Sequence, residues 1–251
     1  MAANTSEPTL SAAIRGWWRD ESSRLGKFRA AKNFLSILRE FLRDSTPARR
    51  RSRYGDIDFD WERRVDTTGA TVSNRDRLLG MFHSPYQPTE PALFHEMMET
   101  LAREPGFDFS QFTFIDIGSG KGRALLLAAD YPFKQIIGIE LLPELHRIAQ
   151  QNISRYKSDS QKCFQLLPVC GDATQYAFAP GAILLYLFNP LPEKGLRELL
   201  ERLQQNLHQN SQKSTPALRI IYHNPLLANV LDEFSFLRKV ARTHQYAIYE
   251  T

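Results

Sequence analysis

The sequence has few cysteines and no long apolar run, and each shortage excludes a class of protein. The only cysteines, Cys163 and Cys170, lie seven positions apart, which fits neither a disulfide framework nor a zinc site. We therefore expect reduced thiols in a cytoplasmic protein, with no bound metal. The longest apolar run, Ala182 to Phe188, is far shorter than the roughly 18 residues that a membrane-spanning helix needs.

Acidic residues are scarce at the N-terminus. Residues 1–53 hold twelve Lys and Arg against five Asp and Glu, a net charge of +7, whereas the rest of the chain holds twenty against twenty-three, a net charge of −3. Because this larger part is mildly acidic, a groove built for nucleic acid is disfavoured there, and no nucleic-acid partner is expected.

The basic segment, residues 1–53, is predicted to form an amphipathic helix from Asp20 to Asp44, followed by an exposed basic linker from Ala48 to Arg53. Apolar positions recur along the helix at steps of three and four: Leu25, Phe28, Ala31, Leu35, Leu38 and Leu42. Two interpretations stay open. The helix could pack on the rest of the chain or on a partner protein, or it could attach to an anionic membrane surface or an acidic partner.

The most informative stretch runs from Phe112 to Arg123 (FTFIDIGSGKGR). Its apolar first half is typical of a buried strand that ends in Asp116, and a helix pattern starts at Ala124. Between them, glycines at alternate positions let the backbone approach a ligand, and the start of the helix offers free N–H groups. A tight turn without a ligand is the plain alternative. The pattern favours a nucleotide-type site formed by Asp116, Gly118, Ser119, Gly120 and Gly122.

The spacing decides which nucleotide fits. The dinucleotide fingerprint requires a small residue where this chain has Arg123, and the phosphate-binding P-loop requires a hydroxyl where it has Gly122. The remaining pattern, D-x-G-x-G-x-G, resembles motif I of the class I S-adenosylmethionine-dependent methyltransferases. That resemblance implies S-adenosylmethionine as the cofactor.

Two later acids fit the same interpretation. Gln135 to Glu140 is an apolar strand pattern whose terminal acid lies 24 positions after Asp116, and an acid at the tip of the second strand can accept both ribose hydroxyls. The turn around Asp172 resembles the adenine-binding turn of the family, in which the acid meets the exocyclic amine. Each acid also has an interpretation without a ligand: Glu140 could be a solvated carboxylate at a strand end, and Asp172 could belong to a plain Gly-Asp turn.

Residues 54–110 are expected to lie on the acceptor side and to end in a helix from Ala92 to Ala102. Thr89 is predicted to cap that helix, with Pro91 in its first turn. Tyr86 opens a Tyr-x-Pro-Thr segment that resembles non-SET nucleosomal lysine methyltransferases, the mitochondrial ATP-synthase c-subunit lysine methyltransferases and an uncharacterised bacterial methyltransferase family. In such enzymes this segment folds over the methyl donor, so the resemblance implies a catalytic role for Tyr86.

Beyond motif I, helix and strand patterns alternate and finish in two strands, Phe236 to Arg242 and Gln245 to Tyr249. This order predicts an α/β fold: a doubly wound, Rossmann-like, seven-stranded sheet with an antiparallel last strand. The class I resemblance covers roughly Tyr86 to Thr251. Residues 111–251 are assigned to the core that binds S-adenosylmethionine.

Two predicted strand ends carry candidate acceptor residues. Asn189 stands where amino-methyltransferases carry Asn/Asp/Ser-Pro-Pro-aromatic, so the resemblance implies that it contacts the cofactor and holds an acceptor nitrogen. The second proline and the aromatic residue are absent, since position 191 is Leu191, which leaves nitrogen methylation open. His223 could act as a general base. Asn189-Pro190 could instead be a plain strand-ending turn, and His223 could simply be hydrogen-bonded at the end of its strand.

Three functions remain for comparison. The favoured one is methyl transfer to an amine, either on a protein lysine or on a small molecule. The second is a catalytically silent S-adenosylmethionine-binding partner or regulatory module. The third, a nucleotide-dependent oxidoreductase, is disfavoured by Arg123. The sequence does not identify the acceptor.

Overall fold

The structure is a computed structural model that describes residues 10–44, 57–68, 87–210 and 217–251. The chain divides into two compact units. The N-terminal unit comprises Met1–Glu62 and Thr68–Pro88, and the sheet unit comprises Arg63–Thr67 and Thr89–Thr251.

The N-terminal unit contains an antiparallel pair of helices, α1 (Leu10–Leu25) and α2 (Lys27–Asp44), and most of the short helix α4 (Ile57–Arg63). Gly26 separates the pair and has a left-handed φ of +81°, a conformation that side chains with a Cβ rarely adopt. The prediction of one continuous helix from Asp20 to Asp44 is therefore wrong. The ring of Phe34 lies 5.9 Å from that of Trp17 and joins the two helices. The predicted basic linker lies outside the described residues.

The sheet unit is built on a seven-stranded sheet with the order β3-β2-β1-β4-β5-β7-β6. The first five strands of that order are parallel, and β7 runs antiparallel to both of its neighbours. This confirms the predicted doubly wound sheet with an antiparallel last strand. The strands are β1 (Phe112–Ile117), β2 (Gln135–Glu140), β3 (Leu166–Cys170), β4 (Ala182–Leu187), β5 (Leu218–His223), β6 (Arg238–Arg242) and β7 (Tyr246–Glu250).

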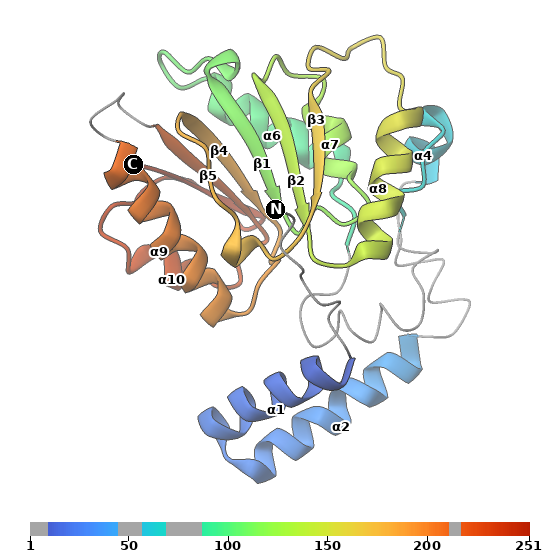
Figure 1. Cartoon of the computed structure of the whole chain (residues 1–251), viewed down its shortest axis with the longest axis vertical. Coiled ribbons are helices and arrows are strands. Elements are labelled where there is room, and N and C mark those ends of the chain that lie inside the picture. Colours follow the sequence, from blue (N-terminus) through green and yellow to red (C-terminus); the bar gives the residue numbers. More distant parts are fainter. Residues whose placement is uncertain (1–9, 45–56, 69–86, 211–216) are drawn as a thin grey trace. The chain divides into compact units, whose positions relative to one another are not determined.

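Helices cover both faces of the sheet (Figure 1). One face carries α9 (Glu193–Asn210) and α10 (Ala228–Asp232), and the opposite face carries α6 (Pro91–Ala102) and α7 (Arg123–Ala128). The helix α8 (Pro143–Arg155) packs beside β2 and β3. Short 3₁₀ turns occupy Phe109–Gln111 (η2) and Ala173–Gln175 (η3).

The two faces have different cores, because alternate residues of a strand point to opposite sides. On the α9 face, aliphatic strand residues such as Ile115 and Leu185 pack against a row of leucines on that helix: Leu196, Leu199, Leu200 and Leu203. On the α6 face the core is aromatic. Phe94 is fully buried there, with its ring 6.0 Å from Phe114 and 5.6 Å from Tyr186.

The start of α6 differs from the prediction in one respect. Pro91 is in the first turn, as predicted, but the N-cap is Glu90 and it makes no side-chain capping bond. The hydroxyl of Thr89 is instead hydrogen-bonded to that of Tyr186 at 3.0 Å. The cap prediction for Thr89 is therefore wrong, because a buried tertiary partner takes its hydroxyl.

Truncating the aromatic core should destabilise the sheet unit strongly. Phe94→Ala removes a fully buried ring, and we expect a loss of about 3–5 kcal/mol in the free energy of unfolding. Phe164→Ala is the matched control, because Phe164 is 77% exposed and should change stability by less than about 0.5 kcal/mol. Urea denaturation followed by circular dichroism measures both. Equal losses in the two variants would contradict this account of the core.

Candidate functional site

The carboxyl ends of β1, β2 and β4 meet at one edge of the sheet, because β1 lies between β2 and β4. The chain leaves β1 toward β2 on one side and later returns to β4 on the other, so the strand order reverses here. In open α/β sheets, ligands bind outside the carboxyl ends of the strands at such a switch point. The predicted glycine motif follows β1 at this place.

The turn after β1, Gly118–Gly122, has a backbone that requires its glycines. Gly118, Gly120 and Gly122 have φ values of +74°, +55° and +86°, all in the left-handed region that disfavours other residues. A Cβ on Gly118 would lie 2.8 Å from the Cβ of Pro190. We call this segment the glycine turn. The backbone N–H groups of Gly118 and Ser119 both donate to the carbonyl of Ile139, at 2.8 and 3.1 Å, and so anchor the turn to β2.

Glu140, at the end of β2, contacts the glycine turn directly. Its Oε2 accepts a hydrogen bond of 2.7 Å from the backbone N–H of Gly120, and its Oε1 accepts one of 2.8 Å from that of Leu142. A carboxylate oxygen can accept more than one hydrogen bond, so the contact with the turn is compatible with a ligand contact. The structure thus brings Glu140 and Gly120 together and gives the acid a structural task that the sequence did not predict.

Asp116 is buried at the end of β1, beside Tyr186 of β4 in the sheet register. Burial, and secondly the negative charge of Glu140, raise the pKa of the Asp116 carboxyl well above its ordinary value. The two acids therefore compete for ionisation at one strand edge. A cationic group bound nearby would relieve that competition.

The side chain of Ser119 is buried in the glycine turn, and its Oγ has no hydrogen-bond partner among the described residues. It faces Gly138 of β2, where an added Cβ would lie 2.8 Å from that Oγ and 2.5 Å from Cδ1 of Leu125. Sequence reasoning missed Gly138. The available signal was a glycine inside a predicted buried strand, which often marks a close approach.

Asp172 follows β3 and caps the 3₁₀ turn η3. Its Oδ1 accepts hydrogen bonds of 2.8 Å from both the backbone N–H and the hydroxyl of Thr174. The preceding Gly171 donates its N–H to the carbonyl oxygen of Glu140 at 2.9 Å, so the two predicted acids lie on adjoining strand ends. Within the described chain, no residue donates a hydrogen bond to Oδ2 of Asp172, which leaves that oxygen for a ligand.

Asn189 has a left-handed φ of +46° and ties the end of β4 to the end of β5. Its Nδ2 donates to the carbonyl of Asn224 at 2.6 Å, and its Oδ1 accepts from the hydroxyl of Tyr222 at 2.9 Å. Both ends of the amide are therefore engaged in linking two strand ends. Its role toward an acceptor stays a prediction, and Tyr86 lies outside the described residues.

His223 belongs to a buried chain of hydrogen bonds that sequence reasoning did not foresee. Its Nδ1 lies 2.8 Å from the hydroxyl of Tyr186, which in turn lies 3.0 Å from the hydroxyl of Thr89. The ring of Phe188 stacks on the imidazole, with ring centres 3.8 Å apart. Burial lowers the pKa of His223 to about 4 and raises that of Tyr186 well above its ordinary value. Both side chains are consequently neutral near pH 7.

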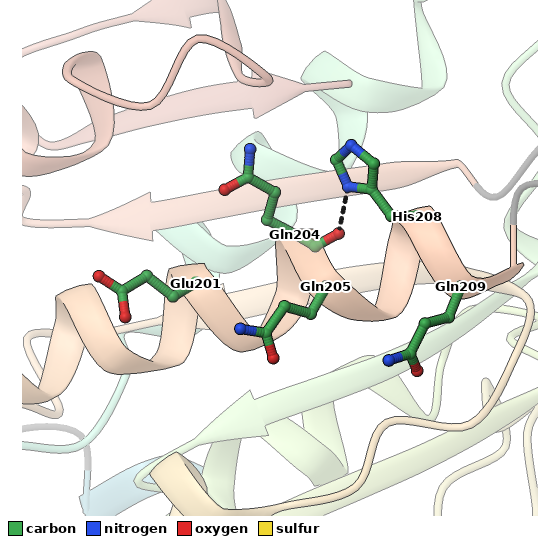
Figure 2. Close-up of a pocket in the computed structure, with 5 residues that line it drawn as sticks. All are labelled: Glu201, Gln204, Gln205, His208 and Gln209. Carbon is green, nitrogen blue, oxygen red and sulfur yellow. Dashed lines mark hydrogen bonds between the residues drawn. The ribbon is translucent and has the colours of Figure 1, made fainter.

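A separate surface hollow of about 350 Å³ lies along α9, lined by Glu201, Gln204, Gln205, His208 and Gln209. Figure 2 shows all five side chains on this one helix, with Nδ1 of His208 hydrogen-bonded to the carbonyl of Gln204 at 2.8 Å. Since α9 runs back from the carboxyl end of β4, its second half lies away from the glycine turn. Across the described ranges, no group of three His, Cys, Asp or Glu could hold a metal, and no helix is long and apolar enough to cross a membrane.

The strand order and the antiparallel β7 define the class of the fold, which is that of the class I methyltransferases. Neither models of protein families nor curated proteins give a match to the sequence.

Solved structures do resemble the chain. The glycopeptide N-methyltransferase MtfA complexed with (S)-adenosyl-L-methionine is 13% identical, with 66% of this chain and 67% of that chain covered and a TM-score of 0.41. An RNA methyltransferase from Salinibacter ruber in complex with S-adenosyl-L-homocysteine is 17% identical, with 65% and 91% covered and a TM-score of 0.40. The rRNA methyltransferase aviRa from Streptomyces viridochromogenes is 13% identical, with 66% and 85% covered and a TM-score of 0.45. The class of the fold rests on the strand order of the chain itself.

The buried imidazole gives a pH prediction. Because the folded-state pKa of His223 is about 4 and an unfolded histidine titrates near about 6.5, its contribution to stability is complete above about pH 6.5 and is lost as the pH falls toward 4. A histidine NMR titration should show one ring with a midpoint near pH 4, absent from His223→Asn. A midpoint near 6.5 would mean that the ring is solvated.

Proposed function

We propose that the protein is an S-adenosylmethionine-dependent methyltransferase. The observation that carries this proposal is the hydrogen bond between Glu140 and the backbone N–H of Gly120, in a left-handed glycine turn at the switch point of the sheet. This hydrogen bond joins two features that a nucleoside-binding site requires: an acid that can accept from the ribose hydroxyls, and a backbone that can approach the ligand closely.

The residues around the turn fit this cofactor. The backbone at Gly120 would allow close approach of adenosine, Glu140 would accept from the ribose hydroxyls, and Asp172 keeps one oxygen for the exocyclic amine. The buried hydroxyl of Ser119 offers a further polar group. When bound, the cofactor supplies a methyl group on a cationic sulfur that is already activated for in-line transfer. The protein then mainly has to orient the acceptor and exclude water.

An amine acceptor must lose a proton, and His223 is the candidate base. Its imidazole is neutral near pH 7, and Nδ1 is bonded to Tyr186. Its pKa of about 4 makes it a weak base in the free protein. For Nε2 to accept a proton, Nδ1 must carry hydrogen and donate it to the Tyr186 hydroxyl, which then donates its own to Thr89. In this arrangement each hydrogen bond is donated from His223 toward Thr89, and Nε2 is left as the basic nitrogen of the imidazole. The acceptor would be an amine of a protein lysine or of a small molecule.

One observation favours a second function, a catalytically silent module that binds S-adenosylmethionine. The amide of Asn189 is engaged at both ends by Asn224 and Tyr222, and a residue held in this way has less freedom to bind an acceptor. Incubating a lysate with purified protein and radiolabelled S-adenosylmethionine, then separating labelled protein from small molecules, distinguishes the two. Label in protein, or in a small molecule other than S-adenosylmethionine, above that of a lysate without the purified protein supports the enzyme, and binding without such label supports the module.

The two acids should contribute unequally to cofactor affinity. Glu140→Ala removes both the proposed ribose contacts and the bond to Gly120, whereas Asp172→Ala removes one proposed contact. Each hydrogen bond to a charged group is worth about 1.5–3 kcal/mol, so Glu140→Ala should bind S-adenosylhomocysteine at least about tenfold more weakly than Asp172→Ala does. Isothermal titration calorimetry measures both. Equal or reversed losses would mean that the roles are misassigned.

Acceptor-side residues should affect turnover rather than cofactor affinity. Asn189→Ala and Tyr86→Phe should bind S-adenosylmethionine almost normally, because neither is proposed to hold the adenosine half. Groups that orient the acceptor act on the transition state, so kcat should fall at least about tenfold, roughly 1.4 kcal/mol of barrier. Wild-type turnover in both variants would place the acceptor elsewhere along the strand ends.

A further inference from the structure

A five-residue segment from far upstream packs against the back of the glycine turn. This strap, Arg63–Thr67, belongs to the sheet unit. Its backbone is held by the side chain of Asn152 on α8: the N–H of Asp66 donates to Oδ1 at 2.8 Å, and Nδ2 donates to the carbonyl of Asp66 at 2.8 Å. The same Nδ2 also donates to the carbonyl of Lys121, at 2.9 Å. One amide therefore joins the strap to the turn.

Two cationic side chains of the turn region reach the strap. Lys121 has no exposed surface, and its ammonium lies 2.9 Å from Oδ1 of Asp66. Arg123, at the start of α7, is also buried, and its Nε donates to the hydroxyl of Thr67 at 2.6 Å. A buried ammonium is stable only with a counter-charge and satisfied hydrogen bonds. Asp66 supplies such a charge.

The glycine turn has little restraint of its own. Lys121 stands between Gly120 and Gly122, and both glycines have left-handed φ values, of +55° and +86°. Glycine is the residue with the greatest backbone freedom to lose on folding. The shape of the turn therefore depends on its anchors, both the backbone hydrogen bonds of Gly118, Ser119 and Gly122 and the side chains that hold it. Lys121 is the central anchor, and it adjoins the Gly120 N–H that meets Glu140.

We propose that Asp66 is a positioning residue for cofactor binding, and that it acts through Lys121 to hold the Gly120 N–H in its binding geometry. This inference rests on the proposed function. It gives the Arg63–Thr67 strap a part in the binding site without any contact with the cofactor. The electrostatic effect is local: the Asp66 carboxylate lies beside the buried Lys121 ammonium and favours its present position under the turn.

The test compares Asp66→Asn with a matched control. Asp232→Asn removes the same carboxylate charge from another Asp–Lys pair of the sheet unit, in which Asp232 lies 2.7 Å from Nζ of Lys239. Affinity for S-adenosylhomocysteine is measured by calorimetry. We expect that at most about one molecule in ten of Asp66→Asn has its glycine turn in the binding conformation. The variant should then bind at least about tenfold more weakly than the wild type. Asp232→Asn should bind as the wild type does.

Two further variants separate charge neutralisation from general damage. Asp66→Glu keeps the charge and should restore binding to within a few-fold of the wild type. Asp66→Asn combined with Lys121→Met removes both charges, so no ammonium is left beside a neutral residue 66, and affinity should also recover. Amide hydrogen exchange gives a readout without cofactor: the Gly120 N–H should exchange faster in Asp66→Asn and at the wild-type rate in Asp232→Asn.

The outcomes separate this inference from the proposed function. Absence of S-adenosylhomocysteine binding by the wild type would overturn both. Normal binding by the wild type and by Asp66→Asn would overturn the role of Asp66 and leave the proposed function intact. If Asp66→Asn does not fold, the double variant decides: recovered binding supports neutralisation of Lys121, and lost binding in a folded double variant contradicts it.

Discussion

The glycine turn after β1 is the constraint on which the rest of the site depends. Its three left-handed glycines allow a close backbone approach, but they leave the turn with few side chains to define its shape. Further restraint comes from the carbonyl of Ile139, the carboxylate of Glu140 and the ion pair of the buried Lys121 with the half-buried Asp66. The first two partners belong to β2 and the last pair joins the turn to the strap, which Asn152 of α8 holds in place. The turn can therefore be correct only when the sheet, α8 and the strap are all in place.

The parts that the sequence predicted are those whose signal is local. The alternation of helix and strand patterns, the glycines at every second position and the acid at the end of β2 all lie within single stretches of chain, and the fold built on them is confirmed. The break at Gly26 was missed because an apolar pattern continues across it, and only the positive φ separates the helices. The helix cap at Thr89 was wrong because Tyr186, distant in sequence, takes the hydroxyl.

The strap was missed for a stronger reason. Asp66 and Lys121 are both charged, and a charged residue in a segment without periodicity is normally expected at the surface. Lys121 is buried and Asp66 is half-buried, and the amide of Asn152 binds both backbones at once. Neither Asp66 nor Lys121 alone has a sequence pattern that predicts the contact, because their ion pair forms only when the chain is folded. The same holds for the chain from Thr89 through Tyr186 to His223, whose members come from a loop and two strands.

The charges that remain at the strand ends also form a pattern. The two cations of the turn region, Lys121 and Arg123, are buried and paired with the strap, whereas the edge of the sheet presents Asp116, Glu140 and Asp172. Burial and the charge of Glu140 raise the pKa of Asp116, so this edge resists holding all its negative charge without a counter-ion. A ligand that carries hydroxyls and a positive charge would satisfy both needs at once: the hydroxyls would donate to Glu140, and the cation would lower the pKa of Asp116 toward its ordinary range. Because proton binding and cation binding at one carboxylate are linked, a cation should bind more weakly while Asp116 is protonated, and its affinity should rise with pH as that carboxyl ionises.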